Sequence, residues 1–517
     1  MAERVHIDLG DIQGDILRAY GNDYDCTSYA FVKIDCPPEQ ARAWFSGLLE
    51  HVTTAAPWKE GKPVTTLNVA VTADGLKALG VSDEVVGSFS EEFRAGMSER
   101  AVLLGDVGPS APKSWESGLG SGDAHILLTI NAQETADHEH ALGKMRDAMD
   151  DAGGLSIVCQ EDTQLLPGSR EHFGYADGFA QPAIEGSSDS KARGGGVPLK
   201  NGAWRALAPG EFILGYPDED TREDPKRRLP SAPLAPLGKS GTYMVWRKLY
   251  QDVARWRRVM RDAAKLYEDG DEHKLSAKVV GRWSDGTPLV THPDAPDPNF
   301  DAAGRGANDF RYDSDLDGMR CPLGAHIRRS NPRDALGFEG HLSFRHRMIR
   351  RGMPYGEELA EGVVKDDGVD RGLVFVCFQA SIARQFEGVQ VQWLNTGNLF
   401  GLGLDTDFIL GDPGGKGKMT IQGRPPFFLS PQEVFVKTRG GEYLFVPGIS
   451  ALAALADLAD LVVEAHYPAV PSASACATRP TASPRRSPTW RDASPTRRPV
   501  RPLRSCASAS RSSPPTP

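Results

Sequence analysis

The distribution of hydrophobic and polar residues predicts alternating strands and helices in the first third of the chain. In chain order, these are a strand over 29–34, a helix over 39–51, strands over 65–71 and 125–130, a helix over 138–153 and a strand over 155–160. Pro37 and Pro38 mark the start of the first helix, and Gly153 closes the second. This order is typical of a ferredoxin-like α+β unit, which we place over residues 5–165.

A second region of strand and helix patterns follows a stretch rich in Gly and Ser at 186–202. Its predicted elements are strands over 242–249 and 372–379, which lead into helices over 250–269 and 380–395. We therefore predict an N-terminal domain over 1–190 and a C-terminal domain over 203–460.

Composition narrows the class of protein. The 517 residues are 40% hydrophobic and 25% charged, as in ordinary globular proteins, and the net charge of −10 argues against a general nucleic-acid surface. The seven cysteines are scattered, without a C-x-x-C pair, which favours reduced thiols. The sequence has no secretion signal and no apolar run long enough to cross a bilayer, so we expect a cytoplasmic protein without a membrane partner. A small-molecule substrate is the better expectation.

The C-terminal tail, 468–517, has a different composition from the rest of the chain. It holds nine Arg, no Lys, one acidic residue, eleven Pro and ten Ser. Such a segment has too few large apolar side chains to offset its ordering entropy, so we predict disorder. Two interpretations stay open: a basic tether for an anionic partner, or the product of a reading-frame change in GC-rich coding sequence.

Three stretches carry candidate chemistry. The first, FGYADGFAQPAIEG (173–186), places Asp177 directly before Gly178, a pattern that by itself favours a structural turn over a catalytic carboxylate. The second, CPLGAHIRRSNPRDA (321–335), places His326 near three arginines. A neutral histidine packed at an interface is the alternative to a metal ligand there.

A third stretch, FRHRMIRRGMPYG (344–356), contains four arginines. If it formed a strand, Arg347 and Arg351 would face one side and Arg350 the other, with some of them solvated. Their number nevertheless favours a nearby anion, since arginine binds carboxylates with two hydrogen bonds. Haem propionates and phosphate both fit this description.

Taken together, these stretches resemble the dye-decolourising peroxidase family of haem enzymes. GYADG fits the family's G-x-x-D-G motif, GAHIRRSNPRD its proximal-histidine segment, and RRGMPYG the segment with its distal arginine. Three further segments look like family landmarks: DIQGDILRAYG (11–21), FQASIARQFEGVQVQW (378–393) and GGEYLFVPGISAL (440–452). The resemblance extends over residues 8–455.

The resemblance implies a fold class of α+β, with two ferredoxin-like domains, antiparallel sheets and one haem b per chain, mainly in the C-terminal domain. It implies that His326 is the proximal iron ligand and that Asp177 and Arg350 lie on the distal face. It further assigns haem contacts to Arg329, at a propionate, and to Leu373 and Phe375, as walls of the distal pocket, although these two apolar residues fit the core of a buried strand equally well.

The implied activity is the reduction of hydrogen peroxide and the oxidation of bulky aromatic donors, such as dyes and phenols. Asp177 would be the acid-base group, and Arg350 would stabilise negative charge. Trp393 and Tyr443 are candidate electron relays, although most such residues simply pack.

Several alternatives stay open from the sequence. The carboxylate behind His326 could be any of three, namely Glu387, Asp405 and Asp407. A homo-oligomer is one option for the assembly. The alternative function is haem binding, storage or iron release with little peroxidase turnover, and a third hypothesis is an interaction scaffold without haem.

Overall fold

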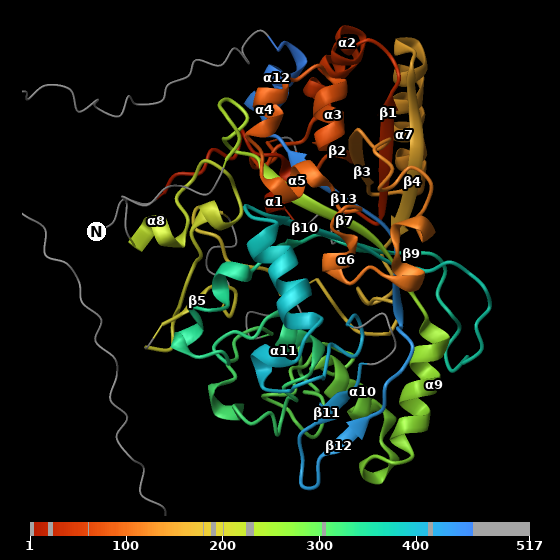
Figure 1. The fold of residues 1–517 in the computed structure, drawn as a ribbon, viewed down its shortest axis with the longest axis vertical. Coiled ribbons are helices and arrows are strands. Elements are labelled where there is room, and N and C mark those ends of the chain that lie inside the picture. The colour runs from red at the N-terminus through yellow and green to blue at the C-terminus, as the bar shows by residue number, and fades with distance from the viewer. Residues whose placement is uncertain are drawn as a thin grey trace, which may run out of the picture. The chain divides into compact units, whose positions relative to one another are not determined.

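The hydrophobic segments of the first third form half of a large antiparallel sheet (Figure 1). This computed structural model describes residues 5–18, 24–59, 61–178, 180–187, 193–199, 201–223, 232–301, 307–411 and 417–458. The half-sheet consists of β1 (Cys26–Ile34), β2 (Thr65–Val71), β3 (Ile126–Ala132) and β4 (Leu155–Gln164), in the spatial order β4-β1-β3-β2. Helices α2 (Pro38–Leu48) and α7 (Thr135–Ala152) pack on one face, which completes a ferredoxin-like arrangement.

The second half repeats this plan. Its strands are β7 (Thr242–Gln251), β8 (Ile349–Arg350), β9 (Met353–Tyr355), β10 (Gly372–Gln379) and β13 (Val436–Val446), and its order is β13-β7-β10-β8, with β9 paired to β10. Its main helices are α9 (Val253–Ala264) and η10 (Ala383–Leu394), which is a π-helix. A pairing of Phe445 with Val71 joins the two halves, so that nine strands of the described residues form one sheet.

Shorter elements complete the described part of the chain. The helices are α1 (Gly14–Leu17), α3 (Ala73–Ala78), α4 (Asp83–Gly87), α5 (Glu91–Ala95), α6 (Ala101–Leu104), α8 (Glu219–Glu223), α10 (Glu272–Val280), α11 (His326–Ser330) and α12 (Ile449–Ala456). The strands are β5 (Val197–Pro198), β6 (Trp204–Arg205), β11 (Met419–Ile421) and β12 (Phe427–Leu429). In the ranges described above, no helix is long and apolar enough to cross a membrane.

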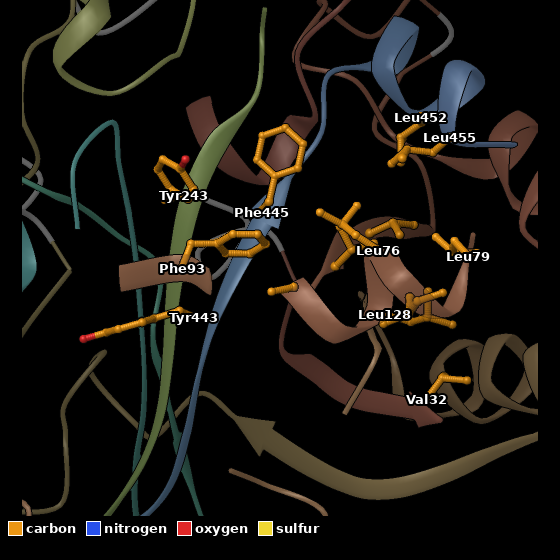
Figure 2. Packing of buried hydrophobic residues seen from close by; sticks show 14 of the residues in the cluster. Val32, Leu76, Leu79, Phe93, Leu128, Tyr243, Tyr443, Phe445, Leu452 and Leu455 are labelled. Atoms are coloured by element: carbon orange, nitrogen blue, oxygen red, sulfur yellow. The ribbon is translucent and has the colours of Figure 1, made fainter. Parts of the chain in front are cut away.

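Two buried clusters occupy opposite faces of the strands, because successive side chains alternate. One contains Tyr243, Tyr443 and Phe445 and extends to the helices; Figure 2 shows Phe445 beside Tyr243, with Leu452 and Leu455 of α12 in the same cluster. The other lies between the two half-sheets, where the Trp246 ring meets the edge of Phe31 at a centroid distance of 4.9 Å. A third cluster, built largely from α9, α10 and the β11–β12 hairpin, lies beside the candidate site.

The predicted fold class, α+β with two ferredoxin-like units and antiparallel sheets, is confirmed. Contacts group residues 1–463 into one compact unit, and the tail predicted to be disordered, 468–517, lies outside the described residues. The strand considered as one possibility for 344–356 forms only in part: residues Phe344–His346 form a 3₁₀ turn, and Ile349–Arg350 and Met353–Tyr355 pair as short strands.

Candidate active site

A cavity of about 300 Å³ lies beside the second half-sheet, between its strands and the segments α11 and η10. Leu373 and Phe375 line it from β10. Their neighbours Val374 and Val376 belong to the core between the half-sheets, as the alternation along a strand requires. The two apolar residues implied by the resemblance are therefore cavity walls in this structure.

His326 enters the cavity as the first residue of α11. Its Nδ1 donates to Oδ2 of Asp407 at 2.9 Å, and Asp407 is fully buried. Burial alone would lower the pKa of His326, but the Asp407 carboxylate outweighs burial and raises that pKa. In the neutral imidazole, Nδ1 carries the proton that it donates to Asp407, so Nε2 has its lone pair available for a ligand.

The structure decides among the three carboxylates considered for His326. Asp407 is the partner, whereas Glu387 accepts from Arg100 at 2.6 Å and from the Tyr443 hydroxyl at 2.9 Å. Asp405 is also occupied elsewhere, because it accepts from the backbone N–H of Thr420 at 2.8 Å and pairs with Lys418. The spacing along the sequence could not separate these three acids.

Asp177 lines the same cavity from a loop without regular secondary structure. Gly174 and Gly178 flank it with φ of 97° and 92°, so the turn predicted from the sequence and the carboxylate in the cavity coexist. The half-buried carboxylate of Glu171 accepts the backbone N–H groups of Phe173 at 2.8 Å and Tyr175 at 3.0 Å. These bonds fix the loop that presents Asp177.

Arg350 faces Asp177, with Nη1 at 3.4 Å from Oδ1. Burial would raise the pKa of Asp177, but Arg350, the Gly178 N–H and the more distant charge of His326 together lower it. Asp177 is therefore a carboxylate at neutral pH.

The side-chain amide of Gln181 hydrogen-bonds both the backbone N–H and the backbone carbonyl of Arg350. Its Oε1 accepts the Arg350 N–H at 3.1 Å, and its Nε2 donates to the Arg350 carbonyl at 2.9 Å. The sequence reasoning missed this residue, although it lies only four positions after Asp177 in the same motif. Its amide links the two motifs that are far apart in sequence.

The arginines near the site divide into two kinds. Arg347 lines the cavity, and within the described residues its guanidinium has no ion-pair partner. Burial, and then repulsion from Arg333 and Arg350, lower its pKa to about 9. Arg333 also lines the cavity and donates to backbone carbonyls, including that of Phe310 at 3.0 Å. These cations suit an anionic group in the cavity.

Arg329 is of the other kind and does not line the cavity. It is fully buried and donates to three backbone carbonyls, those of Trp393, Thr396 and Asp405, each at 2.8 Å. The propionate contact implied for Arg329 stays a prediction. Among the residues that line the cavity, Arg347 offers a guanidinium without an ion-pair partner in the described part of the chain.

The two candidate electron relays are buried near the cavity. The Trp393 ring is 4.7 Å from that of His346, a cavity residue, and only 3% of Trp393 is exposed. Tyr443 is 1% exposed, and its ring lies 6.1 Å from Phe386, which also lines the cavity. Neither side chain can contact a bulky donor directly.

The residues present fit a haem group. A histidine held by a buried carboxylate enters from the α11 side, and a carboxylate and an arginine enter from the loop and the sheet. Apolar side chains such as Leu373, Phe375 and Leu410 supply the walls, and Arg347 supplies a cation without an ion-pair partner in the described part of the chain. Such a donor set suits a flat, apolar, dianionic ligand with a metal at its centre.

Comparisons with known proteins agree with this donor set. Residues 11–157 match the model of the DyP dimeric alpha+beta barrel domain, and residues 232–399 match that of the Dyp-type peroxidase C-terminal domain. A multifunctional dye peroxidase of an Amycolatopsis species is 31% identical over 86% of this chain and 96% of its own, and a dye-decolorizing peroxidase of Mycetinis scorodonius is 28% identical over 86% and 87%. The structure of an ancestral D-type dye-decolorizing peroxidase superposes with a TM-score of 0.74 at 28% identity, over 87% of this chain and 99% of its own.

The fold and the site thus define a peroxidase of the haem-dependent class. The chain belongs to the dye-decolourising peroxidase family, and the resemblance found in the sequence is confirmed.

Proposed function

We propose that the cavity binds one haem b per chain and that Nε2 of His326 is the protein ligand to its iron. The observation that carries this proposal is the hydrogen bond between His326 and the buried Asp407, which leaves Nε2 as the donor atom on the cavity side. When bound, haem supplies the redox centre at which peroxide is reduced and oxidising equivalents are held.

Asp177 and Arg350 act on the peroxide. Asp177 would accept a proton from one oxygen of hydrogen peroxide and return it to the other, so that the protonated oxygen leaves as water when the O–O bond breaks, while the bound haem would supply the two electrons that this cleavage requires. Arg350 stays cationic and stabilises the negative charge that develops as the bond breaks. The 3.4 Å contact between them keeps the carboxylate charged and directed toward the cavity.

Arg347 is the residue that we propose for a haem propionate, in place of Arg329. A half-buried cation in the cavity wall, with no ion-pair partner in the described residues, gains most from a carboxylate brought by a ligand. Arg333, which also lines the cavity, adds positive charge nearby.

The donors are bulky aromatic molecules oxidised at the protein surface. A dye-decolorizing peroxidase at 25% identity has been solved in complex with 2,6-dimethoxyphenol, which supports a phenolic substrate class here. Because Trp393 and Tyr443 are buried, they would pass electrons on and would not meet the donor. The cytoplasmic location and the homo-oligomer remain predictions from the sequence.

The test uses the haem-loaded protein, its Asp177→Asn and Arg350→Leu variants, and rapid mixing with hydrogen peroxide. Both variants should keep the Soret band and lose roughly 10²- to 10⁴-fold in the rate of reaction with peroxide, the range for a positioned acid-base group. Full reactivity in both variants would contradict these roles. A Soret band indifferent to peroxide in the unmodified protein would favour haem storage or iron release, and a region of 289 residues does match deferrochelatases at 33% identity.

A further inference from the structure

A second cavity, of about 130 Å³, adjoins the Asp177–Arg350 pair. Both residues line this cavity as well as the larger one. Its other walls come from the core between the half-sheets, including Tyr29 of β1 and Thr129 of β3. Glu171, Leu373 and Phe375 also line both cavities, so the ion pair belongs to the wall that the two cavities share.

Asp15 also lines the second cavity, although it lies near the N-terminus of the chain, far in sequence from Asp177 and Arg350. It belongs to α1, within the segment DIQGDIL, to which neither the fold nor the site assigns a function. The residue is 7% exposed, and its Oδ1 has no hydrogen-bond partner among the described residues. A buried carboxyl oxygen without a partner is costly, so such atoms usually have water or a functional role as their reason.

The charged and titratable groups around Asp15 come from several elements. Arg351 anchors the segment by donating to the backbone carbonyls of Asp15 at 3.1 Å and Ile16 at 3.2 Å. Tyr29 faces it from β1, and its hydroxyl has no hydrogen-bond partner within the described ranges. The remaining charged groups of the cavity wall are Arg170, Glu171, Asp177 and Arg350.

Burial raises the pKa of Asp15 to about 7, although the charge of Arg351 opposes this effect. A carboxyl group of this kind can both hold and release a proton near neutral pH. The cavity has room for several water molecules, and the polar atoms of Asp15, Tyr29 and Asp177 give them partners.

We propose that Asp15 is a proton-exchange residue that resupplies Asp177 through water in the second cavity. The inference rests on the distal role proposed above for Asp177. Reduction of one hydrogen peroxide to two waters consumes two electrons from the aromatic donors and two protons. A proton passes from the Asp15 carboxyl to cavity water, from water to the Asp177 carboxylate, and from Asp177 to the oxygen that the donors' electrons reduce to the second water. Bulk solvent then reprotonates Asp15, so Asp15 and Asp177 both end the cycle as they began it.

The test compares Asp15→Asn with Asp11→Asn in the haem-loaded full chain. Asp11 lies in the same segment, but its Oδ1 accepts the backbone N–H of Ser450 at 2.8 Å and it does not line the cavity. Since acid-base groups contribute roughly 10²- to 10⁴-fold and solvent partly replaces a relay, we expect Asp15→Asn to lower kcat about tenfold. The solvent deuterium isotope effect on kcat should increase, while the KM for the donor and the Soret band stay unchanged. Asp11→Asn should match the unmodified protein.

Infrared spectroscopy supplies a readout that is independent of turnover. The unmodified protein should have a protonated-carboxyl band that disappears as the pH rises through about 7, and Asp15→Asn should lack this band. If Asp15→Asn does not fold, Tyr29→Phe keeps the packing, and it should shift the band and lower kcat. An unchanged band and kcat in Asp15→Asn, or in Tyr29→Phe where that variant takes its place, would overturn the proposal. If Asp177→Asn keeps full peroxide reactivity, the distal assignment fails; if Asp177→Asn loses it while Asp15→Asn does not, only this inference fails.

Discussion

His326 Nδ1 and Asp407 Oδ2 are 2.9 Å apart, and the other oxygen of Asp407 accepts the backbone N–H groups of Ile409 at 3.0 Å and Leu410 at 2.8 Å. The carboxylate is thus fixed by its own loop and in turn fixes the imidazole ring. Burial would raise the pKa of Asp407, but His326 opposes this and the net pKa is lowered. The pair gives His326 a defined tautomer and a stronger donor atom at Nε2.

We predict that Asp407→Asn weakens haem binding by about 10- to 100-fold, the usual effect of losing a partner behind a metal-bound histidine. The amide is a weaker acceptor than the carboxylate, so the reduction potential of the bound haem should rise. Haem titration and potentiometry measure the two effects. A matched change at Glu387→Gln should leave the potential unaltered, because Glu387 pairs with Arg100 and Tyr443 and not with His326.

The rate constant of the reaction with hydrogen peroxide should fall at acidic pH. Since Asp177 acts as a base and its pKa is lowered from 3.8, the active carboxylate is present above that lowered pKa and is lost as the pH falls through it. The rate should therefore be level near neutral pH. In Arg350→Leu the residual rate should decline at a higher pH, since the cation that lowers the pKa is gone. Stopped-flow pH profiles of both proteins check this, and superimposable acid limbs would contradict it.

Arg347 and Arg329 should respond differently to replacement by leucine. Arg347→Leu should lower haem affinity by about tenfold with little loss of stability in the haem-free protein, since its guanidinium has no ion-pair partner among the described residues. Arg329→Leu should destabilise the protein by roughly 3 kcal/mol or more, because three buried carbonyls lose their donors. Haem titration and denaturant unfolding separate the two effects. If Arg347→Leu and Arg329→Leu lost haem affinity equally, the result would support Arg329 as a propionate contact.

The free energy of unfolding should decrease as the pH rises, because the buried carboxyl group of Glu442 loses its proton. Burial raises the pKa of Glu442 from 4.5 to about 8. The hydrogen bond from the Gly120 N–H at 2.5 Å lowers this pKa, but by less than burial raises it. The folded state holds the proton more tightly, so the associated stability is complete below pH 4.5 and is lost as the pH rises through about 8. Glu442→Gln should remove this part of the pH dependence, with an upper bound of roughly 5 kcal/mol. The exposed Glu84→Gln is the control, and denaturant unfolding across this pH range is the measurement.

The sequence by itself predicted the four strands and the two main helices of the first half, and in the second half the strands β7 and β10 with the helices that follow them, because their periodicity and their Pro and Gly signals are local. It did not predict β8, β9 or β13. It also identified Asp177, His326 and Arg350 as candidate site residues, because each lies in a short, contiguous motif. All three line one cavity.

Tertiary structure alone identified Asp407, rather than Glu387 or Asp405, as the hydrogen-bond partner of His326. The three acids lie close together in sequence, and only the packing of the chain brings one of them to His326. It also placed Arg347 beside Arg350 in the cavity, against the strict alternation of a strand, because the 3₁₀ turn at Phe344–His346 ends the regular pattern before β8. Gln181 and Asp15 acquire their positions through partners more than 150 residues away along the chain. Contacts of that range depend on how the two half-sheets close on each other, which no local pattern encodes.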